Sequence, residues 1–193
     1  MVAEMDVDRS FDHAGTPVQS PNRVRAERFG GPVLDENAEF ASSGFLVRKC
    51  ELRDVGGKLA TVRGNDVRFR DGAKLSFEVF KTGVRPRHGR TVLVDGAGSV
   101  MASAEWDSGD HYFQVHGADR TYTVDRAEER HRWQIHGDGV VAAFDRRLVE
   151  VNDCVPVIAL LLAWRIATML EHMPGGGNQR AKAWNRPDEI LGS

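Results

Sequence analysis

Between residues 45 and 145, apolar and polar side chains alternate in short segments that are separated by turns. Alternation with a period of two is typical of β-strands that bury one face. We count ten such segments: FLVRKCELRD, KLATVRG, DVRFR, KLSFEVF, RTVLVD, SVMASAEW, HYFQVH, RTYTVD, HRWQIH and VVAAFD. The pattern predicts a meandering antiparallel sheet, with no helix of any length before residue 150.

The junctions between these segments carry turn signals. Asp and Gly occur together at Asp54-Val55-Gly56-Gly57, Asp71-Gly72, Asp95-Gly96 and Asp138-Gly139. Asp-Gly between alternating segments favours a tight hairpin turn, in which both central residues take φ > 0. Consecutive segments are therefore expected to pair with each other.

One apolar stretch differs from the rest. Residues 154–170, CVPVIALLLAWRIATML, carry polar side chains only at Arg165 and Thr168 after an apolar first half. We predict a helix over 153–172, capped by Asn152 or Asp153, with Pro156 in its first turn and His172 near its C-terminal dipole. A helix that is apolar all round must be buried in lipid or in protein. Its 17 residues are fewer than the roughly 20 that span a bilayer, and an arginine near mid-bilayer is unfavourable, so burial in protein is favoured.

A long meander followed by one apolar helix predicts a mainly β fold, a closed antiparallel barrel of about 12 strands around a central C-terminal helix. Closure removes the exposed edges of such a sheet, and a barrel of this size is too wide for side chains alone to fill. Residues 23–40 are expected to supply the last two strands, Val24–Phe29 and Pro32–Phe40, around a turn at Gly30-Gly31-Pro32.

The barrel is expected to occupy residues 23–173, between an acidic flexible arm (1–22) and a Gly-rich tail (174–193). The tail contains Trp184 and is either a docking segment or a loosely packed end. The first residues lack an apolar h-region, so they do not form a signal peptide, and a cytoplasmic location is expected. Cys50 and Cys154 lie in apolar surroundings and are interpreted as buried free thiols.

The repeated Asp-x-Gly hairpins, and the apolar helix entered through VEVNDCVPVIALLLAWRIATML, resemble the tubby C-terminal-like superfamily, which includes the LURP-one-related proteins and the phospholipid scramblases. The resemblance covers residues 23–173 and implies a twelve-stranded barrel threaded by a hydrophobic helix. It also implies that basic residues on the barrel bind phosphoinositide headgroups. The cysteine-rich stretch and the metal-binding segment of the scramblases are not recognisable here.

The best candidate site is the loop KTGVRPRHGR, in which no acidic residue accompanies the basic ones. Its candidate ligands for an anionic lipid headgroup are Lys81, Arg85, Arg87, His88 and Arg90. From Lys58 to Arg90 there are nine Lys and Arg against three acidic residues, in a chain whose formal net charge is −2. Arginine suits phosphate because its guanidinium donates two parallel hydrogen bonds. The alternative is a solvated loop that balances the acidic remainder.

Metal and catalytic sites are not expected. His111 and His116, like His131 and His136, are five residues apart, so the members of each pair point to opposite faces of a strand. His116 and His136 share a face but lie on either side of strand 120–125, too far apart for one zinc ion. Glu105 and Asp107 share a strand face without a nucleophile or cofactor loop nearby. We therefore expect a non-enzymatic protein that needs no cofactor or metal.

Arg165 lies in the apolar helix and needs either a carboxylate partner, for which Glu105 and Asp107 are candidates, or a route to water at the barrel mouth. The leading functional hypothesis is binding or regulation at anionic phospholipid or phosphoinositide headgroups, with a cytoplasmic protein peripheral to the membrane. The alternatives are a structural or protein-interaction module and an enzyme that uses Glu105, Asp107 or the histidines. No nucleic-acid partner is expected.

Overall fold

The computed structural model describes residues 21–43, 49–81, 87–117, 120–128 and 131–173. Its elements in chain order are α1 (Pro21–Phe29), β1 (Val33–Leu34), β2 (Ala38–Ser43), β3 (Lys49–Asp54), β4 (Gly57–Arg63), β5 (Asp66–Phe69), β6 (Lys74–Lys81), β7 (His88–Asp95), β8 (Val100–Asp107), β9 (Tyr112–His116), β10 (Thr121–Arg126), β11 (Trp133–Gly137), β12 (Gly139–Phe144), β13 (Leu148–Val151), β14 (Val155–Pro156) and α2 (Val157–Glu171). The predicted arm, residues 1–20 of it, and the predicted tail, with Trp184, lie outside the described residues.

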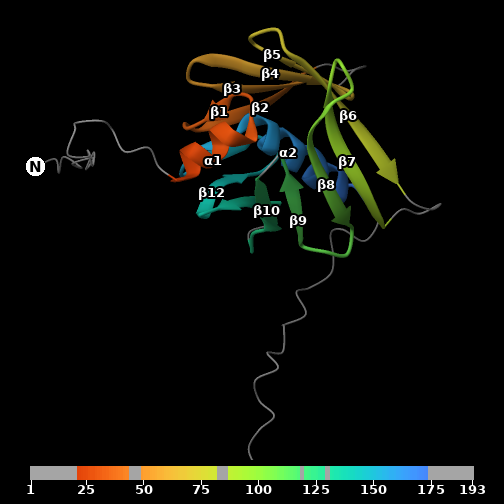
Figure 1. Cartoon of the computed structure of the whole chain (residues 1–193). Coiled ribbons are helices and arrows are strands. Elements are labelled where there is room, and N and C mark those ends of the chain that lie inside the picture. The colour runs from red at the N-terminus through yellow and green to blue at the C-terminus, as the bar shows by residue number, and fades with distance from the viewer. Residues whose placement is uncertain (1–20, 44–48, 82–86, 118–119, 129–130, 174–193) are drawn as a thin grey trace, which may run out of the picture.

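Strands β2 to β13 form one closed antiparallel barrel of twelve strands, which confirms the predicted fold class (Figure 1). Each strand pairs with its neighbours in the chain, and β13 closes the barrel by pairing with β2, Val149 opposite Ala38. The ten segments predicted from the alternating pattern are β3 to β12. The short strands β1 and β14 form a separate pair outside the barrel.

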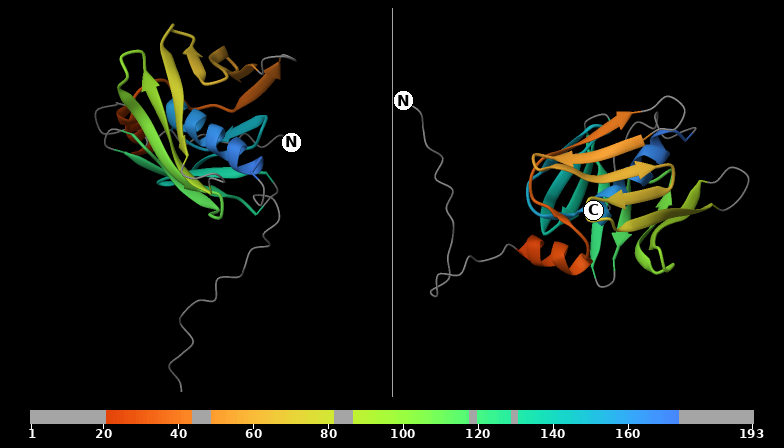
Figure 2. Two further views of the ribbon diagram at one scale, coloured as in Figure 1. Left: turned by 90° about the vertical axis from the view of Figure 1, so that its right-hand side faces the viewer. Right: turned by 90° about the horizontal axis from the view of Figure 1, so that it is seen from above.

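Helix α2 runs through the interior of the barrel and completes its core (Figure 2). Ten of its 15 residues are buried, including Leu160, Leu161 and Leu162. Because the barrel strands supply apolar side chains on every side, a helix without a polar face is stable here. No described helix reaches the length and hydropathy that crossing a bilayer requires.

The start of α2 differs from the prediction, whereas its end agrees. The helix begins at Val157, and Pro156 is its N-cap in an extended conformation. Val155 and Pro156 instead pair with β1, and an extended backbone is also what the residue before a proline prefers. Asp153, a predicted cap, accepts a hydrogen bond from Asn22 at 2.9 Å. His172 is the C-cap, and its Nδ1 donates to the Thr168 carbonyl at 2.6 Å.

The residues before β2, and strand β13, differ from the predictions. Residues 24–29 are not a strand, and the prediction of no helix before residue 150 is wrong, because Pro21–Phe29 form helix α1. Pro21 occupies its first turn, and Arg23 pairs with Glu27 at 3.2 Å. Phe29 is buried against the ring of Tyr122, at 5.5 Å between centroids. The predicted strand Pro32–Phe40 divides into β1 and the first part of β2, of which only β2 belongs to the barrel. The twelfth barrel strand is β13, which lies in the segment predicted as the entry of the helix.

The turns are tight, as predicted. Their aspartates, however, do not have the positive φ that we predicted for them. The positive φ values fall on glycines such as Gly72 and Gly139. The aspartates instead accept hydrogen bonds from backbone N–H groups two or more residues later: Asp71 from Ala73 at 2.9 Å, and Asp95 from Ser99 at 2.8 Å. A carboxylate that bonds the turn backbone stabilises the turn without a left-handed aspartate.

Every second turn of the meander lies at one end of the barrel, and α2 ends there too. Glu171 there contacts the turn after β12 through Arg146 and the turn before β11 through His131. We call this the exit end. The end of β6, the start of β7 and the turn between β4 and β5 lie at this exit end as well.

Candidate functional site

The predicted basic loop is the hairpin that joins β6 to β7. Lys81 ends β6 opposite Gly89, and Arg90 lies opposite Phe80 across the same pair of strands. Lys81, Arg87, His88 and Arg90 are all exposed, and Arg85 lies outside the described residues. Among the described residues, no salt bridge engages Lys81, Arg87 or Arg90.

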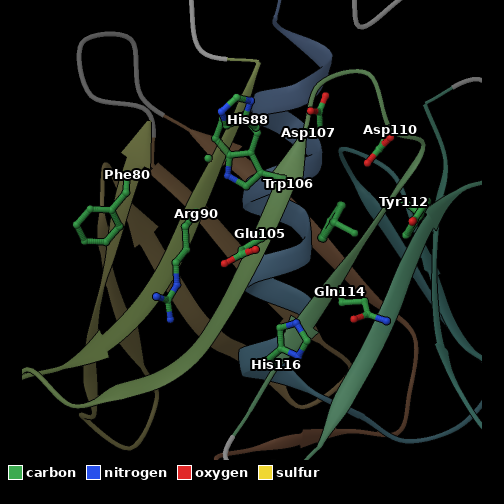
Figure 3. Close-up of a pocket in the computed structure, with 12 residues that line it drawn as sticks. Phe80, His88, Arg90, Glu105, Trp106, Asp107, Asp110, Tyr112, Gln114 and His116 are labelled. Carbon is green, nitrogen blue, oxygen red and sulfur yellow. The ribbon is translucent and has the colours of Figure 1, made fainter. Parts of the chain in front are cut away.

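A hollow of about 610 Å³ lies beside this hairpin, over β7, β8 and β9 (Figure 3). Among the described residues that line it, the carboxylates are Glu105, Asp107 and Asp110, whereas Arg90 is the only arginine and there is no lysine. Glu105 lies opposite Arg90, and Asp107 lies opposite His88, on the neighbouring strands. Three carboxylates against one arginine do not favour an anionic ligand in this hollow.

The hollow also contains Glu105, Asp107 and His116, three of the residues considered for catalysis. Glu105 and Asp107 share the outer face of β8, as their spacing predicts. His116 bonds the Thr121 hydroxyl at 3.1 Å, and on the far side of β10 His136 bonds Asp125 at 2.9 Å. The predicted separation of these two histidines by β10 is therefore confirmed.

No metal site emerges from the described ranges. Within them, no cluster of three or more His, Cys, Asp and Glu side chains is arranged to hold a metal ion. Cys50 and Cys154 are free and buried, as predicted, and burial raises the pKa of both thiols. A neutral buried thiol is a poor nucleophile.

A second hollow, of about 970 Å³, lies over the outer face of β3, β4 and β5. The described residues that line it include four basic residues and one acidic residue: Lys49, Lys58, Arg63, Arg68 and Asp66. We call it the basic hollow. Lys49 pairs with Glu51, but no salt bridge within the described part of the chain engages Lys58, Arg63 or Arg68.

The basic residues lie on one face of the sheet because successive side chains of a strand point to opposite faces. Arg63 lies opposite Asp66, and Thr61 lies opposite Arg68, across β4 and β5. Val62 and Val67 alternate with them and point into the core. The Gly64-Asn65 turn brings Arg63 and Arg68 onto one outward face, and Gly64 takes φ +63° there.

The count of charges along the chain indicates a basic region here, but it does not show that these residues line one hollow. From the excess of basic residues between Lys58 and Arg90, only the loop without acidic residues was predicted as a binding site. The signal that identifies the hollow is the alternation Thr61-Val62-Arg63 and Asp66-Val67-Arg68, which puts two arginines on the same face of a two-stranded hairpin.

Arg165 lies at the exit end. Of the two environments predicted for it, a carboxylate partner or a position at the barrel mouth, this agrees with the second. Its side chain is half-buried, its Nη2 donates to Asn65 Oδ1 at 3.1 Å, and its guanidinium carbon lies 5.8 Å from the centre of the Phe77 ring. Glu105 and Asp107 are not its partners, because both lie on the outer face of β8.

Comparison of the chain with family models, with curated proteins and with solved structures yields no match.

Proposed function

We propose that this protein is a non-enzymatic binding protein that recognises anionic phospholipid headgroups, phosphoinositides among them, through the basic hollow. The observation that carries the proposal is the presence of Lys58, Arg63 and Arg68 around one hollow of about 970 Å³, in which Asp66 is the only acidic residue among the described lining residues. Phosphate groups on a membrane surface would meet cations that no carboxylate of the described residues already neutralises.

The hairpin residues Lys81 and Arg87 are proposed to extend this contact, whereas Arg90 lines the hollow that holds Glu105, Asp107 and Asp110. Phe80, which precedes Lys81, is 54% exposed and lies on β6, where it also lines that hollow. An exposed aromatic ring beside lysine and arginine is suited to the boundary between headgroups and acyl chains. Because the hollow beside β8 is rich in carboxylates, the membrane is proposed to contact the hairpin from the β5–β6 side.

The architecture supports the same proposal by resemblance. A closed twelve-strand barrel with a buried C-terminal helix agrees with the tubby-like fold, a superfamily in which barrel residues bind phosphoinositides. A tubby-like relationship is therefore part of the proposal, together with a peripheral position at the membrane.

The test is co-sedimentation of the full chain with vesicles of phosphatidylcholine alone or with added phosphoinositide. We expect binding only to the anionic vesicles, and weaker binding as salt rises. Each Lys or Arg near an anionic surface contributes about 1 kcal/mol. The double variant Arg63→Ser, Arg68→Ser should therefore weaken binding by about 30-fold.

The matched controls separate position from net charge. Arg147→Ser removes one exposed arginine from the turn between β12 and β13, and its binding should equal that of the native chain and exceed that of Arg68→Ser alone. Equal losses in Arg147→Ser and Arg68→Ser would contradict a localised site. Absence of binding at low salt would overturn the proposal in favour of a structural or protein-interaction module.

A further inference from the structure

The hollow of about 610 Å³ over β7, β8 and β9 carries an excess of negative charge, and we call it the acidic hollow (Figure 3). No salt bridge within the described residues engages its three lining carboxylates, Glu105, Asp107 and Asp110. Arg90 lies opposite Glu105 without pairing with it. Asp107 accepts only the backbone N–H of Gly109, at 2.7 Å, among the described residues. Three carboxylates against one arginine therefore leave this face negative.

An exposed aromatic ring adjoins these carboxylates. Tyr112 begins β9 and is 56% exposed, and it lines the hollow together with Asp107 and Asp110. A tyrosine ring attracts a guanidinium or an ammonium group to its face. The acidic hollow is therefore suited to a segment that carries several cations.

The end of α2 lies close to the acidic hollow. Glu171 Oε1 accepts from the Trp133 indole at 3.4 Å, and the Trp133 ring lies 5.7 Å from the ring of Phe113, between centroids. Phe113 in turn lines the hollow. The turn between β8 and β9 is also at the exit end, because the meander places every second turn there. The chain that follows Met173 therefore starts near the carboxylates.

The residues after α2 carry the complementary charge. Residues 174–187 contain three basic residues and no acidic one, and the basic residues and Trp184 are spaced two apart: Arg180, Lys182, Trp184 and Arg186. We call residues 180–186 the cationic segment. In an extended chain, side chains two residues apart point to the same face, whereas in a helix they do not. The pattern therefore predicts an extended segment with one cationic and aromatic face.

The spacing and the reach of this segment both fit the hollow. Glu105 and Asp107 are also two residues apart on one face of a strand, so about 7 Å separates either pair of neighbouring charges. The seven residues from Met173 to Arg180 span up to about 23 Å. Strand β11, which the end of α2 contacts, is two strand spacings from β9, or about 10 Å. The linker is therefore long enough.

We propose that the cationic segment docks, extended, in the acidic hollow of its own chain. It enters from the exit end, so Arg180 pairs with Asp107 and lies over the ring of Tyr112. Lys182 then pairs with Glu105, the next carboxylate along β8.

Trp184 follows beside the imidazole of His116, which lines the far part of the hollow. Gly175, Gly176 and Gly177 precede the cationic segment and allow the chain to turn over the rim of the barrel. Because the segment is attached to the barrel, docking is intramolecular and takes place at a high effective concentration. This favours the chain's own segment over one from another molecule.

The test is cross-linking of the full chain with a water-soluble carbodiimide, which joins a lysine amine directly to a carboxylate in contact with it. We expect mass spectrometry to find Lys182 joined to Glu105 or Asp107 within one chain, with a yield that falls as salt rises. Lys182→Arg keeps the positive charge but has no amine, so this cross-link should disappear.

The second measurement is the rate at which trypsin cleaves after Lys182. The variant Glu105→Gln, Asp107→Asn should be cleaved at least about threefold faster than the native chain, since it loses two exposed ion pairs. The matched control Glu36→Gln, Glu39→Gln removes two exposed carboxylates at and before β2, and its rate should equal the native rate. Both variants should remain folded at the assay temperature, which thermal unfolding verifies.

Three results would overturn the proposal. Cross-links of Lys182 found only in covalent dimers would assign the segment to a second copy of the chain. Cross-links to the acidic arm (1–22) in place of β8 would assign it to the arm. Equal cleavage rates in the native chain and the acidic-hollow variant would show that the segment does not dock there. The Arg63→Ser, Arg68→Ser variant should cross-link normally whether or not it binds vesicles, so the two proposals can fail independently.

Discussion

At the scale of single residues, the charged side chains differ in whether they form an ion pair. Glu51 lies between Lys49 and Arg53 on the outer face of β3 and bonds both. These bonds lower the pKa of its carboxyl from 4.5 to about 2. Arg165, at the other extreme, has only an amide oxygen as a hydrogen-bond acceptor among the described residues. The first arrangement stabilises the native state, and the second leaves a half-buried charge without an ion pair among the described residues.

The lowered pKa of Glu51 predicts an acid-dependent loss of stability. A carboxyl whose pKa is lower in the folded than in the unfolded state stabilises the fold fully above about pH 4.5, and this contribution is lost as the pH falls toward 2. Glu51→Gln should therefore lower the free energy of unfolding at pH 7 and have little effect near pH 2. Urea unfolding across this range measures the difference.

The control for this prediction is Glu78→Gln, which changes an exposed carboxylate on β6. It should alter the free energy of unfolding by less than about 0.5 kcal/mol at any pH. An equal effect of Glu51→Gln at pH 2 and pH 7 would show that its ion pairs contribute nothing.

At the scale of elements, the sheet depends on close approach at Gly89. A Cβ on Gly89 would lie 2.5 Å from the carbonyl oxygen of Phe80 and 2.5 Å from Cζ2 of Trp106. Trp106 cannot move easily, because its indole N–H donates to Thr91 at 3.0 Å in the core. A glycine at this position allows β6, β7 and β8 to pack around that indole.

We predict that Gly89→Ala destabilises the protein by about 2 kcal/mol through overpacking. Gly96→Ala is the matched control, because a Cβ there meets nothing within 4 Å and the backbone has no positive φ. Its effect should stay within about 0.5 kcal/mol. Guanidinium unfolding of both variants measures the contrast, and equal effects would argue against steric contact with Trp106.

At the scale of the whole molecule, barrel and helix share one core. Side chains of α2 and of the barrel strands belong to a single buried cluster, and Leu161 is fully buried within it. Twelve strands enclose more space than their own side chains fill, so α2 supplies the missing apolar volume. Neither part is expected to be stable alone.

Leu161→Ala should therefore lower the free energy of unfolding of the entire domain by about 3 kcal/mol. Because the core is shared, the loss of β-sheet signal by circular dichroism and the change in tryptophan fluorescence should occur in one coincident transition. Two separate transitions in this variant would show that the barrel persists without its helix.

Local pattern was sufficient for the elements whose residues interact mainly with neighbours in the chain. Strands β3 to β12 follow from alternation because each pairs with the next across a short turn. The helix at 21–29 and the strand at 148–151 were missed because both are short, and their state depends on distant partners. Phe29 packs on Tyr122, and Val149 pairs with Ala38.

The sequence by itself determined the antiparallel meander, the buried apolar helix and the excess of basic residues between Lys58 and Arg90, since each is a property of consecutive residues. Only the tertiary structure decided which charges meet. It placed three carboxylates beside Arg90, gathered Arg63 and Arg68 over one hollow, and left Arg165 without a carboxylate among the described residues. The reason is physical: charge interactions depend on distance in space, and barrel closure sets those distances between residues that are far apart in the chain.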